Sequence, residues 1–423
     1  MKLLFRGSET YDAALTELSR RGDSDLERVE PDVRAILAHV RRDGDDALRV
    51  LTERFEQRTV DRLVWDRASI EQGAAALDPA VRTRLEEAAA RIRRYHEHQR
   101  EPGFRYEEDG ISLGLRVRPV RAAGVYAPGG KARYPSSVLM AAVPAAVAGV
   151  PRIVLATPRP TPEILAAAAI AGVTELVDAG GAQAIAALAY GTASVGRVDK
   201  IVGPGNLYVA CAKRLVFGVV DIDGIAGPSE ILVVADDGAD PVVVAADLLS
   251  QAEHDEDAYA LLVTLGEAQA RAVAEEVERQ LARLPRRAVA ERSIRDHGMA
   301  FVVGSLDEAG RVADLLAAEH LSLQVRDPEA LLANIGAAGA AFLGDHTPEA
   351  AGDYAAGPSH VLPTGGAARF SSPLGVWDFL VRTSLISYSA EAIDRQADLL
   401  ESLARLEGLE AHALAVSVRR RRA

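Results

Sequence analysis

The chain has 423 residues, 48% of them hydrophobic, which is enough for more than one domain with a buried core. Its 48 basic and 61 acidic side chains give a net charge of −13, which argues against binding to a phosphate backbone. The single cysteine, Cys211, excludes an intrachain disulfide and a zinc cluster of several thiolates from one chain. Any zinc site must therefore use nitrogen and oxygen ligands. The basic run Arg419–Arg422 is interpreted as a solvated tail.

The sequence shows neither a targeting signal nor a membrane span. Residues Met1 to Ser8 do not have the pattern of a secretory signal. The most apolar stretch, Val138–Val150, is shorter than a membrane span and contains Pro144. We therefore expect a soluble, cytoplasmic protein that has neither a membrane nor a nucleic acid as a partner.

The predicted elements change in character along the chain. The first hundred residues predict amphipathic helices at Pro31–Arg42 and at Asp66–Arg100. From about Gly124, β-branched runs alternate with Ala-rich helical runs, which predicts an α/β fold with mainly parallel sheets. The predicted strands are Ile153–Ala156, Glu175–Val177, Lys200–Val202, Val219–Ile222, Ile231–Ala235, Ala260–Thr264, Ala300–Val303 and Ser322–Val325. A loop rich in Gly, Pro and Ser, Gly352–Gly375, precedes a further helical segment at Ala390–Val418.

Glycine-rich turns mark possible ligand sites. The turns Gly203–Asn206 and Gly227–Glu230 bring polar residues to strand ends, where open α/β sheets bind ligands. The chain has no G-x-G-x-x-G after a strand and no Walker A motif. Tyr126–Gly130 and Gly180–Gln183 precede helical runs, and such turns can receive a phosphate at a helix N-terminus.

Two side-chain pairs have the composition of a catalytic centre. Gln251 and His254 share a face of a predicted helix that runs from Asp240 to Glu253 and just beyond, and they can hold a divalent metal. The alternative is a capped helix end with a surface histidine. Glu319 and His320 follow the predicted helix Leu306–Ala317 and can divide acid–base work. Adjacent side chains on a helix point in different directions, so this pair can act on one substrate only if it lies at a helix terminus or in a turn. The alternative is that the two residues have no catalytic role and form a solvated helix end.

Further candidates lie near the C-terminus. Asp353, Tyr354 and His360 occur in the Gly/Pro-rich loop, where a scaffold often positions functional side chains, and the alternative is an ordinary polar loop. Glu407 and His412 are five residues apart on the last helical segment and do not share a helix face. The alternative for these two residues is a surface helix.

Together these segments resemble the histidinol dehydrogenase family, in order and over nearly the whole chain. Three positions depart from the family's commonest pattern: Asp314 stands where Asn is frequent, Ala318 where Pro is frequent, and Ala127 where a bulkier aliphatic residue is usual. The matching blocks are GVYAPGGKARYPSSVLMAAVPAAVAGV (124–150), GGAQAIAALAYGT (180–192), VDKIVGPGNLYVACAKR (198–214), AGPSEILVVAD (226–236), DLLSQAEHD (247–255), AAEHLSLQV (317–325), GDYAAGPSHVLPTGGAARF (352–370) and EGLEAHALAV (407–416).

The resemblance implies two incomplete Rossmann-like domains, one inserted in the other, with an N-terminal helical segment and a C-terminal helical arm. We place the N-terminal segment at residues 1–22. The first α/β domain, with the zinc and acid–base residues, is placed at 23–125 and 230–374, and the NAD-binding second domain at 126–229. The arm, 375–423, is expected to cross to the partner subunit of a homodimer with shared active sites.

The resemblance also implies a set of site residues. One zinc per subunit would be bound by Gln251, His254, Asp353 and His412, with the last ligand coming from the partner subunit. Glu319 and His320 match the acid–base pair, and Tyr126, Gln183 and Asn206 match the NAD-contacting positions. The implied substrate-binding residues are Ser229, Gln251, His254, His320, Asp353, His360, Glu407 and His412.

The implied reaction is the four-electron oxidation of L-histidinol, through L-histidinaldehyde, to L-histidine with two NAD, the last step of histidine biosynthesis. His320 would take the hydroxyl proton, and Glu319 would then activate water to attack the aldehyde. Three alternatives differ in class. They are a related zinc dehydrogenase that acts on another small alcohol such as a sulfonated diol, a non-catalytic binding dimer, and a zinc hydrolase, which needs an open zinc position for water.

Overall fold

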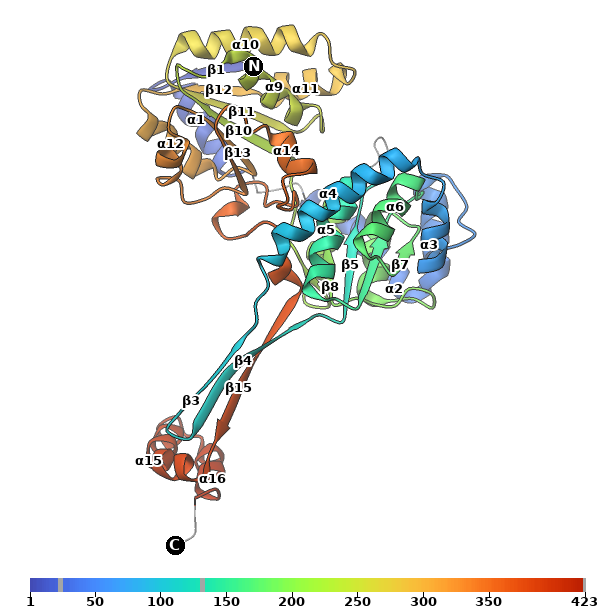
Figure 1. Cartoon of the computed structure of the whole chain (residues 1–423), viewed down its shortest axis with the longest axis vertical. Helices are drawn as coiled ribbons and strands as arrows, with labels where there is room; N and C mark the ends of the chain where they lie inside the picture. Colours follow the sequence, from blue (N-terminus) through green and yellow to red (C-terminus); the bar gives the residue numbers. More distant parts are fainter. Residues whose placement is uncertain (22–25, 130–133, 421–423) are drawn as a thin grey trace. The chain divides into compact units, whose positions relative to one another are not determined.

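The computed structural model describes residues 1–21, 26–129 and 134–420. Contacts divide the chain into two compact units (Figure 1). The first consists of Met1–Gln99 and Arg121–Phe379, and the second consists of Arg100–Val120 and the chain from Leu380 onward. Among the described residues, no helix combines the length and the apolar character needed to cross a bilayer.

The first unit contains two six-stranded sheets. The first sheet has the strand order β1-β12-β11-β10-β13-β14, and each neighbouring pair is parallel. All six residues of its strand β10 are buried, as expected for a strand that is covered on both faces. The strands are β1 (Lys2–Phe5), β10 (Glu230–Ala235), β11 (Tyr259–Thr264), β12 (Met299–Val302), β13 (His320–Gln324) and β14 (Ala340–Leu343).

Helices cover both faces of this sheet. Leu232 and Val234 of β10 pack into one core, whereas Ile231 and Val233 pack into the other, which is the two-residue period of a strand. The first core is closed by α1 (Glu9–Ser19), α12 (Leu306–Leu316) and α13 (Pro328–Leu332). The second is closed by α9 (Pro241–Ala252), α10 (Glu267–Leu281) and α11 (Arg287–His297). The short helix α14 (Glu349–Tyr354) follows β14.

The second sheet has the order β2-β7-β6-β5-β8-β9 and is parallel except for β2, which runs antiparallel to β7. Its strands are β2 (Val64–Asp66), β5 (Ala122–Tyr126), β6 (Arg152–Ala156), β7 (Glu175–Val177), β8 (Lys200–Val202) and β9 (Asp221–Ile222). One face carries α2 (Leu26–Glu56), α7 (Gly181–Tyr190) and α8 (Leu207–Val216). The other carries α3 (Arg67–Ala74), α4 (Pro79–Glu97), α5 (Pro135–Ala148) and α6 (Pro162–Ala171) (Figure 1).

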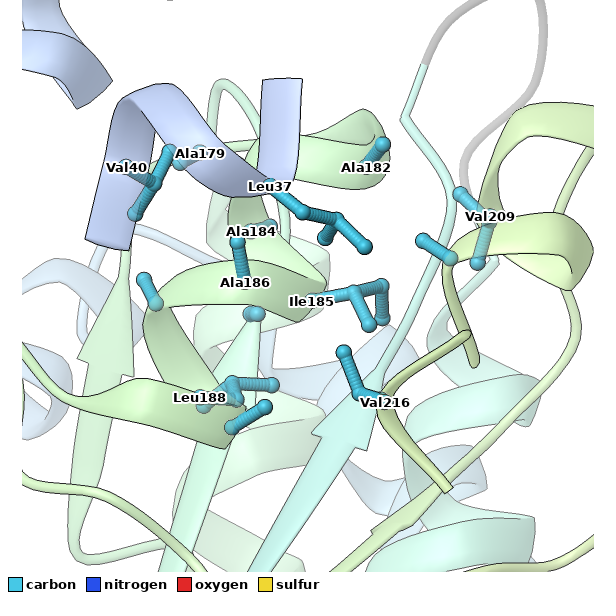
Figure 2. Close-up of a cluster of buried hydrophobic side chains, with 14 of the residues drawn as sticks. Leu37, Val40, Ala179, Ala182, Ala184, Ile185, Ala186, Leu188, Val209 and Val216 are labelled. Atoms are coloured by element: carbon cyan, nitrogen blue, oxygen red, sulfur yellow. The ribbon is translucent and has the colours of Figure 1, made fainter. Parts of the chain in front are cut away.

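The core between the second sheet and α2, α7 and α8 is continuous (Figure 2). Leu37 of α2, Ile185 of α7 and Val216 of α8 meet there, and each of these side chains is at most 5% exposed. Eight consecutive residues of α7 are buried, so this helix is apolar all round, as an internal helix must be. Helix α2 contains a break at Gly44, whose φ of +57° suits glycine.

The second unit combines a sheet with two helices. Strand β15 (Leu380–Tyr388) pairs antiparallel with β4 (Ile111–Pro119) along nine residues, and β3 (Phe104–Glu108) pairs with the other edge of β4. Helices α15 (Ala390–Leu406) and α16 (Glu410–Ser417) follow β15. An ion pair between Arg382 and Glu101 links β15 to the segment before β3.

The α/β fold class is confirmed, and each predicted strand lies within two residues of an observed one. The helical predictions were less accurate at their ends. Helix α2 extends well beyond the predicted Pro31–Arg42, and the predicted Asp66–Arg100 is two helices, because Asp78 caps a new helix that has Pro79 in its first turn. The predicted C-terminal helix is interrupted at Gly408, which has a φ of +74°.

The packing of the chain differs from the predicted domain boundaries. The described part of the predicted N-terminal segment, residues 1–21, is not separate, because β1 and α1 belong to the first sheet and its core. Helix α2 and strand β2 were assigned to the first α/β domain, yet they pack on the second sheet. The arm was predicted from residue 375 as helical; the second unit begins with strand β15 and also takes in residues 100–120. An apolar helix face shows that a helix packs on a sheet but not on which sheet.

Candidate active site

Glu319 and His320 lie at the turn between α12 and β13. Helix α12 ends at Leu316, Ala317 takes a left-handed φ of +44°, and His320 is the first residue of β13. Both acid–base candidates are buried, with 6% and 4% of their surfaces exposed. The pair therefore lies at a helix end, which is the arrangement that allows two adjacent side chains to act together.

This pair lies at the amino edge of the first sheet. Strand β10 begins at Glu230, and His320 is aligned with Ile231 in the neighbouring strand. Helix α9 runs back from the carboxyl edge, so Gln251 and His254 at its end also reach the amino edge. The Gly227–Glu230 turn was expected at a ligand-binding strand end, which in open sheets is the carboxyl end. It precedes β10 instead, so the usual rule does not apply to this sheet.

Hydrogen bonding assigns the proton on His320. Its Nδ1 lies 3.0 Å from the Glu230 carbonyl oxygen, which can only accept, so Nδ1 carries the hydrogen. In the neutral ring Nε2 then has a free lone pair, and it lies 3.7 Å from Glu349 Oε1. The ring also packs against Phe342, with 5.9 Å between ring centroids. His320 is therefore oriented to accept a proton at Nε2.

Glu319 has an unusual protonation state. Burial raises the pKa of its carboxyl to about 8, although the nearby His320 and a hydrogen bond from the Glu230 N–H favour the charged form. That hydrogen bond measures 2.8 Å, from Glu230 N to Glu319 Oε2. A carboxyl that titrates at about 8 can exchange a proton near neutral pH, as a general acid or base must.

A cluster of possible metal ligands adjoins the pair. Nitrogen and oxygen atoms of His254, Glu349 and Asp353 lie within 4.8 Å of one another. His254 Nε2 is 3.8 Å from Asp353 Oδ2. The Gln251 amide, oriented so that both of its atoms have partners, donates to Glu349 Oε1 at 2.9 Å and accepts from Glu230 N–H at 3.2 Å. The structure thus brings together three of the four predicted zinc ligands, and their nitrogen and oxygen donors suit zinc.

Glu349 is a further member of this cluster and was not among the predicted site residues. This side chain is 1% exposed, and burial together with the charge of Asp353 raises its pKa to about 7. It accepts a hydrogen bond of 2.6 Å from Ser250 Oγ. Asp353 had been placed in a loop but lies on α14. The four-residue spacing of Glu349 and Asp353 puts both on one helix face, a signal that the predicted loop concealed.

The other predicted substrate residues are in two places. Ser229, half-buried, immediately precedes β10, and His360 Nδ1 lies 3.1 Å from the Asp353 carbonyl oxygen. Burial lowers the pKa of His360. Glu407 and His412 belong to the second unit, where both are exposed at the end of α15 and on α16. The structure thus associates Ser229 and His360 with the first-unit cluster, and the placement of Glu407 and His412 at that site stays a prediction.

A separate cavity of about 790 Å³ lies at the carboxyl edge of the second sheet. Tyr126, Gln183 and Asn206, the three predicted NAD-contacting residues, all line it. Tyr126 ends β5, and its hydroxyl accepts a hydrogen bond of 3.0 Å from Gly181 N–H at the start of α7. The volume falls in the range of small-molecule sites, and the carboxyl edge of a parallel sheet is where such sites usually form.

Part of this cavity comes from a helix that the sequence analysis did not connect with it. His39, Arg54 and Phe55 of α2 also line the cavity. These residues precede the Gly-rich turns by more than 70 positions, and nothing in their local pattern marks them as ligand contacts. Only the packing of α2 on α7 and α8 brings them to the cavity.

Comparison with known proteins places the chain in a family. The family model described as histidinol dehydrogenase matches residues 19–420. A histidinol dehydrogenase of Aquifex aeolicus is 52% identical over 408 residues, which is 96% of each chain, and one of Bacillus subtilis is 50% identical over 411 residues, again 96% of each. The crystal structure of histidinol dehydrogenase from Elizabethkingia anophelis superimposes with a TM-score of 0.92 at 34% identity, covering 99% of this chain and 98% of that one. The chain therefore belongs to the histidinol dehydrogenase family.

Proposed function

We propose that this protein oxidises L-histidinol through L-histidinaldehyde to L-histidine, with two NAD per substrate, as the last step of histidine biosynthesis. One observation carries the proposal: in a chain of this family, Glu319 and His320 are buried at one sheet edge, and His320 Nε2 lies 3.7 Å from Glu349 in the His254–Glu349–Asp353 cluster. An acid–base pair beside a nitrogen and oxygen ligand set suits the oxidation of a substrate that is itself a metal ligand.

Zinc is proposed at Gln251, His254 and Asp353, completed by His412 of the partner subunit. NAD is proposed in the 790 Å³ cavity, against Tyr126. When bound, zinc would anchor the imidazole and amine of the substrate, and NAD would accept the electron pairs. The sulfur-free ligand set agrees with a chain whose only cysteine, Cys211, is buried elsewhere, in the core of the second sheet.

In the first oxidation His320 acts as the base. Its Nδ1–H is held by the Glu230 carbonyl, which fixes the ring and leaves Nε2 to accept the substrate's hydroxyl proton. Glu349, 3.7 Å from Nε2, has a pKa of about 7 and is placed to stabilise the imidazolium or to share its proton. The aldehyde product stays in the site for the second oxidation.

In the second oxidation Glu319 acts as the base. Its ionised carboxylate takes a proton from the water that attacks the aldehyde carbon. Because its pKa is about 8, the ionised fraction at pH 7 is roughly one tenth, and it rises with pH. We therefore expect alkaline pH to favour the aldehyde step.

The protein is proposed to act as a homodimer with shared sites. The second unit exposes several large apolar side chains, among them Ile386 at 70%, Leu406 at 82% and Leu414 at 58%. Exposed apolar clusters of this kind mark protein interfaces. An isologous contact through β15, α15 and α16 would cover these side chains and would deliver Glu407 and His412 to the partner's site.

The direct test is turnover of L-histidinol by the zinc-loaded protein with NAD. We expect two NADH per histidinol and histidine as the product. His320→Asn should lower kcat by about 10²–10⁴-fold, because it removes the base, while the zinc content stays at one per subunit. His346→Asn, the same change at an exposed loop histidine, is the matched control and should turn over normally.

Other outcomes would redirect the assignment. Turnover of a sulfonated diol but not of histidinol would favour a related alcohol dehydrogenase. Hydrolysis without NAD consumption would indicate a zinc hydrolase, and the absence of any turnover by a correctly folded dimer would favour a binding protein. Unchanged kcat in His320→Asn would remove His320 from the mechanism.

A further inference from the structure

We propose that Glu230, clamped by Arg21, is a positioning residue that holds both Glu319 and His320 in their working orientations. The inference builds on the acid–base roles proposed above. Neither Arg21 nor Glu230 belongs to the predicted site, and neither touches the substrate in the mechanism. Their role would be to fix the two groups that do the proton transfers.

The main chain of Glu230 contacts both members of the pair. Its N–H donates to Glu319 Oε2 at 2.8 Å, and its carbonyl oxygen accepts from His320 Nδ1 at 3.0 Å. The first bond orients the carboxylate, and the second fixes the tautomer of the imidazole. One residue therefore sets the geometry of both catalytic groups, and a shift of its backbone would displace them together.

The side chain of Glu230 ties that backbone in place. Glu230 Oε2 accepts from the Glu319 backbone N–H at 3.4 Å, and Oε1 accepts from Gly365 N–H at 2.7 Å. Arg21 completes the set with two parallel bonds, Nε to Oε1 at 2.8 Å and Nη2 to Oε2 at 2.7 Å. The carboxylate thus connects three separate segments of the chain around the pair.

Arg21 extends this connection to the end of α12. Its guanidinium also donates to the carbonyl oxygens of Leu18 and Leu316, at 2.7 and 2.6 Å. Leu316 is the last residue of α12, three positions before Glu319. The forked guanidinium therefore fixes the segment that leads into the catalytic pair, a geometry that a lysine cannot reproduce.

Stability alone does not account for this arrangement. The Arg21 and Glu230 side chains are only 2% and 1% exposed. Burying two charges has a large desolvation cost, so a buried ion pair is often no more stabilising than an apolar pair of the same volume. The ion pair does fix the positions of the groups that are hydrogen-bonded to it, and these groups belong to Glu319 and to the loop at Gly365. Orientation is therefore the function we assign to it.

The double variant Arg21→Met/Glu230→Leu tests whether the ion pair orients the catalytic groups or only stabilises the fold. It removes both charges and nearly keeps the volume. It also leaves the N–H groups of Glu319 and Gly365 and the carbonyls of Leu18 and Leu316 without these partners, so we expect a lower melting temperature and measure kcat well below it. We expect kcat for histidinol to fall about 10²-fold, because a displacement of about 1 Å at the reacting groups has an effect of that size. KM for NAD should not change. The matched control is Arg152→Met/Glu175→Leu, which removes a bidentate pair with bonds of 2.8 and 3.0 Å from the second sheet; its kcat should equal that of wild type.

A second readout does not depend on turnover. In ¹⁵N spectra of histidine-labelled zinc-loaded protein, His320 should show the Nδ1–H tautomer in wild type and in the control, and should lose it in the Arg21/Glu230 double variant. Arg21→Lys covers the case in which the double variant fails to fold, because it keeps the charge but not the forked geometry. We expect Arg21→Lys to fold, with a kcat reduced about tenfold.

Two results would overturn the inference. One is wild-type kcat in a folded Arg21/Glu230 variant, and the other is an unchanged His320 tautomer in that variant. A wild-type protein that does not oxidise histidinol would instead contradict the proposed function. In that case the ¹⁵N spectra still decide whether Glu230 fixes the imidazole.

Discussion

Replacing Glu319 by glutamine should change how stability depends on pH. The folded protein holds the carboxyl proton up to a pKa of about 8, whereas the unfolded chain releases it near 4.5. Between these values the unfolded state binds fewer protons, so stability falls as pH rises, by about 1.4 kcal/mol per pH unit. Above pH 8 the full cost is about 5 kcal/mol, from 3.5 pH units at 1.36 kcal/mol each. Glu319→Gln has no carboxyl proton to release, so its free energy of unfolding does not fall with pH for this reason.

Urea denaturation followed by circular dichroism, at pH 5, 7 and 9, measures this effect. A chelator is included, because metal binding depends on pH in its own right. The stability advantage of Glu319→Gln over wild type should be small at pH 5 and should grow steadily to pH 8. Glu275→Gln, the same change on an exposed face of α10, should show a difference that does not vary with pH. A flat difference for Glu319→Gln would refute the argument that burial raises the pKa of this carboxyl.

Three other predictions concern different parts of the molecule. Mixing His412→Ala chains with Gln251→Ala chains should restore about a quarter of wild-type activity. Half of the randomly formed dimers are mixed, and each mixed dimer has one intact site out of two. No recovery in verified mixed dimers would contradict shared sites. Ile185→Ala, in the core of Figure 2, should lower the free energy of unfolding by about 2–5 kcal/mol in urea titrations, and a loss below about 1 kcal/mol would contradict tight packing there. Tyr126→Phe removes the acceptor for Gly181 N–H and should weaken NAD binding by roughly 2–10-fold in calorimetry, whereas unchanged affinity would place NAD elsewhere.

Among the described residues, eight of the twelve strands of the two large sheets, β6 to β13, were predicted, and most of these are buried runs. Strands β1, β2, β5 and β14 were missed, although all five residues of β5 are buried. Runs such as Ile231–Ala235 are uniformly apolar and lie between turn residues, and the structure covers them with helices on each side. The spacing of Gln251 and His254 was visible too, but the helix that holds Gln251 ends at Ala252, and His254 lies in the turn that follows.

The strands of the second unit gave no such signal. The sequence of β15, LVRTSLISY, does not alternate clearly between apolar and polar residues, and most of the strand is exposed. All five residues of β3 are exposed as well. A strand without a covered face need not show the two-residue pattern, so only the pairing register with β4 reveals it.

The roles of the site residues stay predictions, whereas the way in which the fold holds them was not predicted. The family resemblance supplied Glu319, His320 and Asp353, and local spacing could have supplied Glu349. Neither predicted that the main chain of Glu230 would hold the acid–base pair, because that contact depends on the register between β10 and β13. The register between strands that are far apart in the sequence cannot be predicted from a local sequence pattern.

The choice of sheet edge also has an electrostatic consequence. At the amino edge of the first sheet, the last carbonyl groups of α9 lie beside His254, whose N–H donates to the Gln251 carbonyl, and the C-terminal end of a helix carries roughly half a negative charge. At the carboxyl edge of the second sheet, α7 and α8 present their amide ends, which carry a similar positive charge. The backbone dipoles alone thus favour a cation at one edge and an anionic dinucleotide at the other, before any side chain is considered.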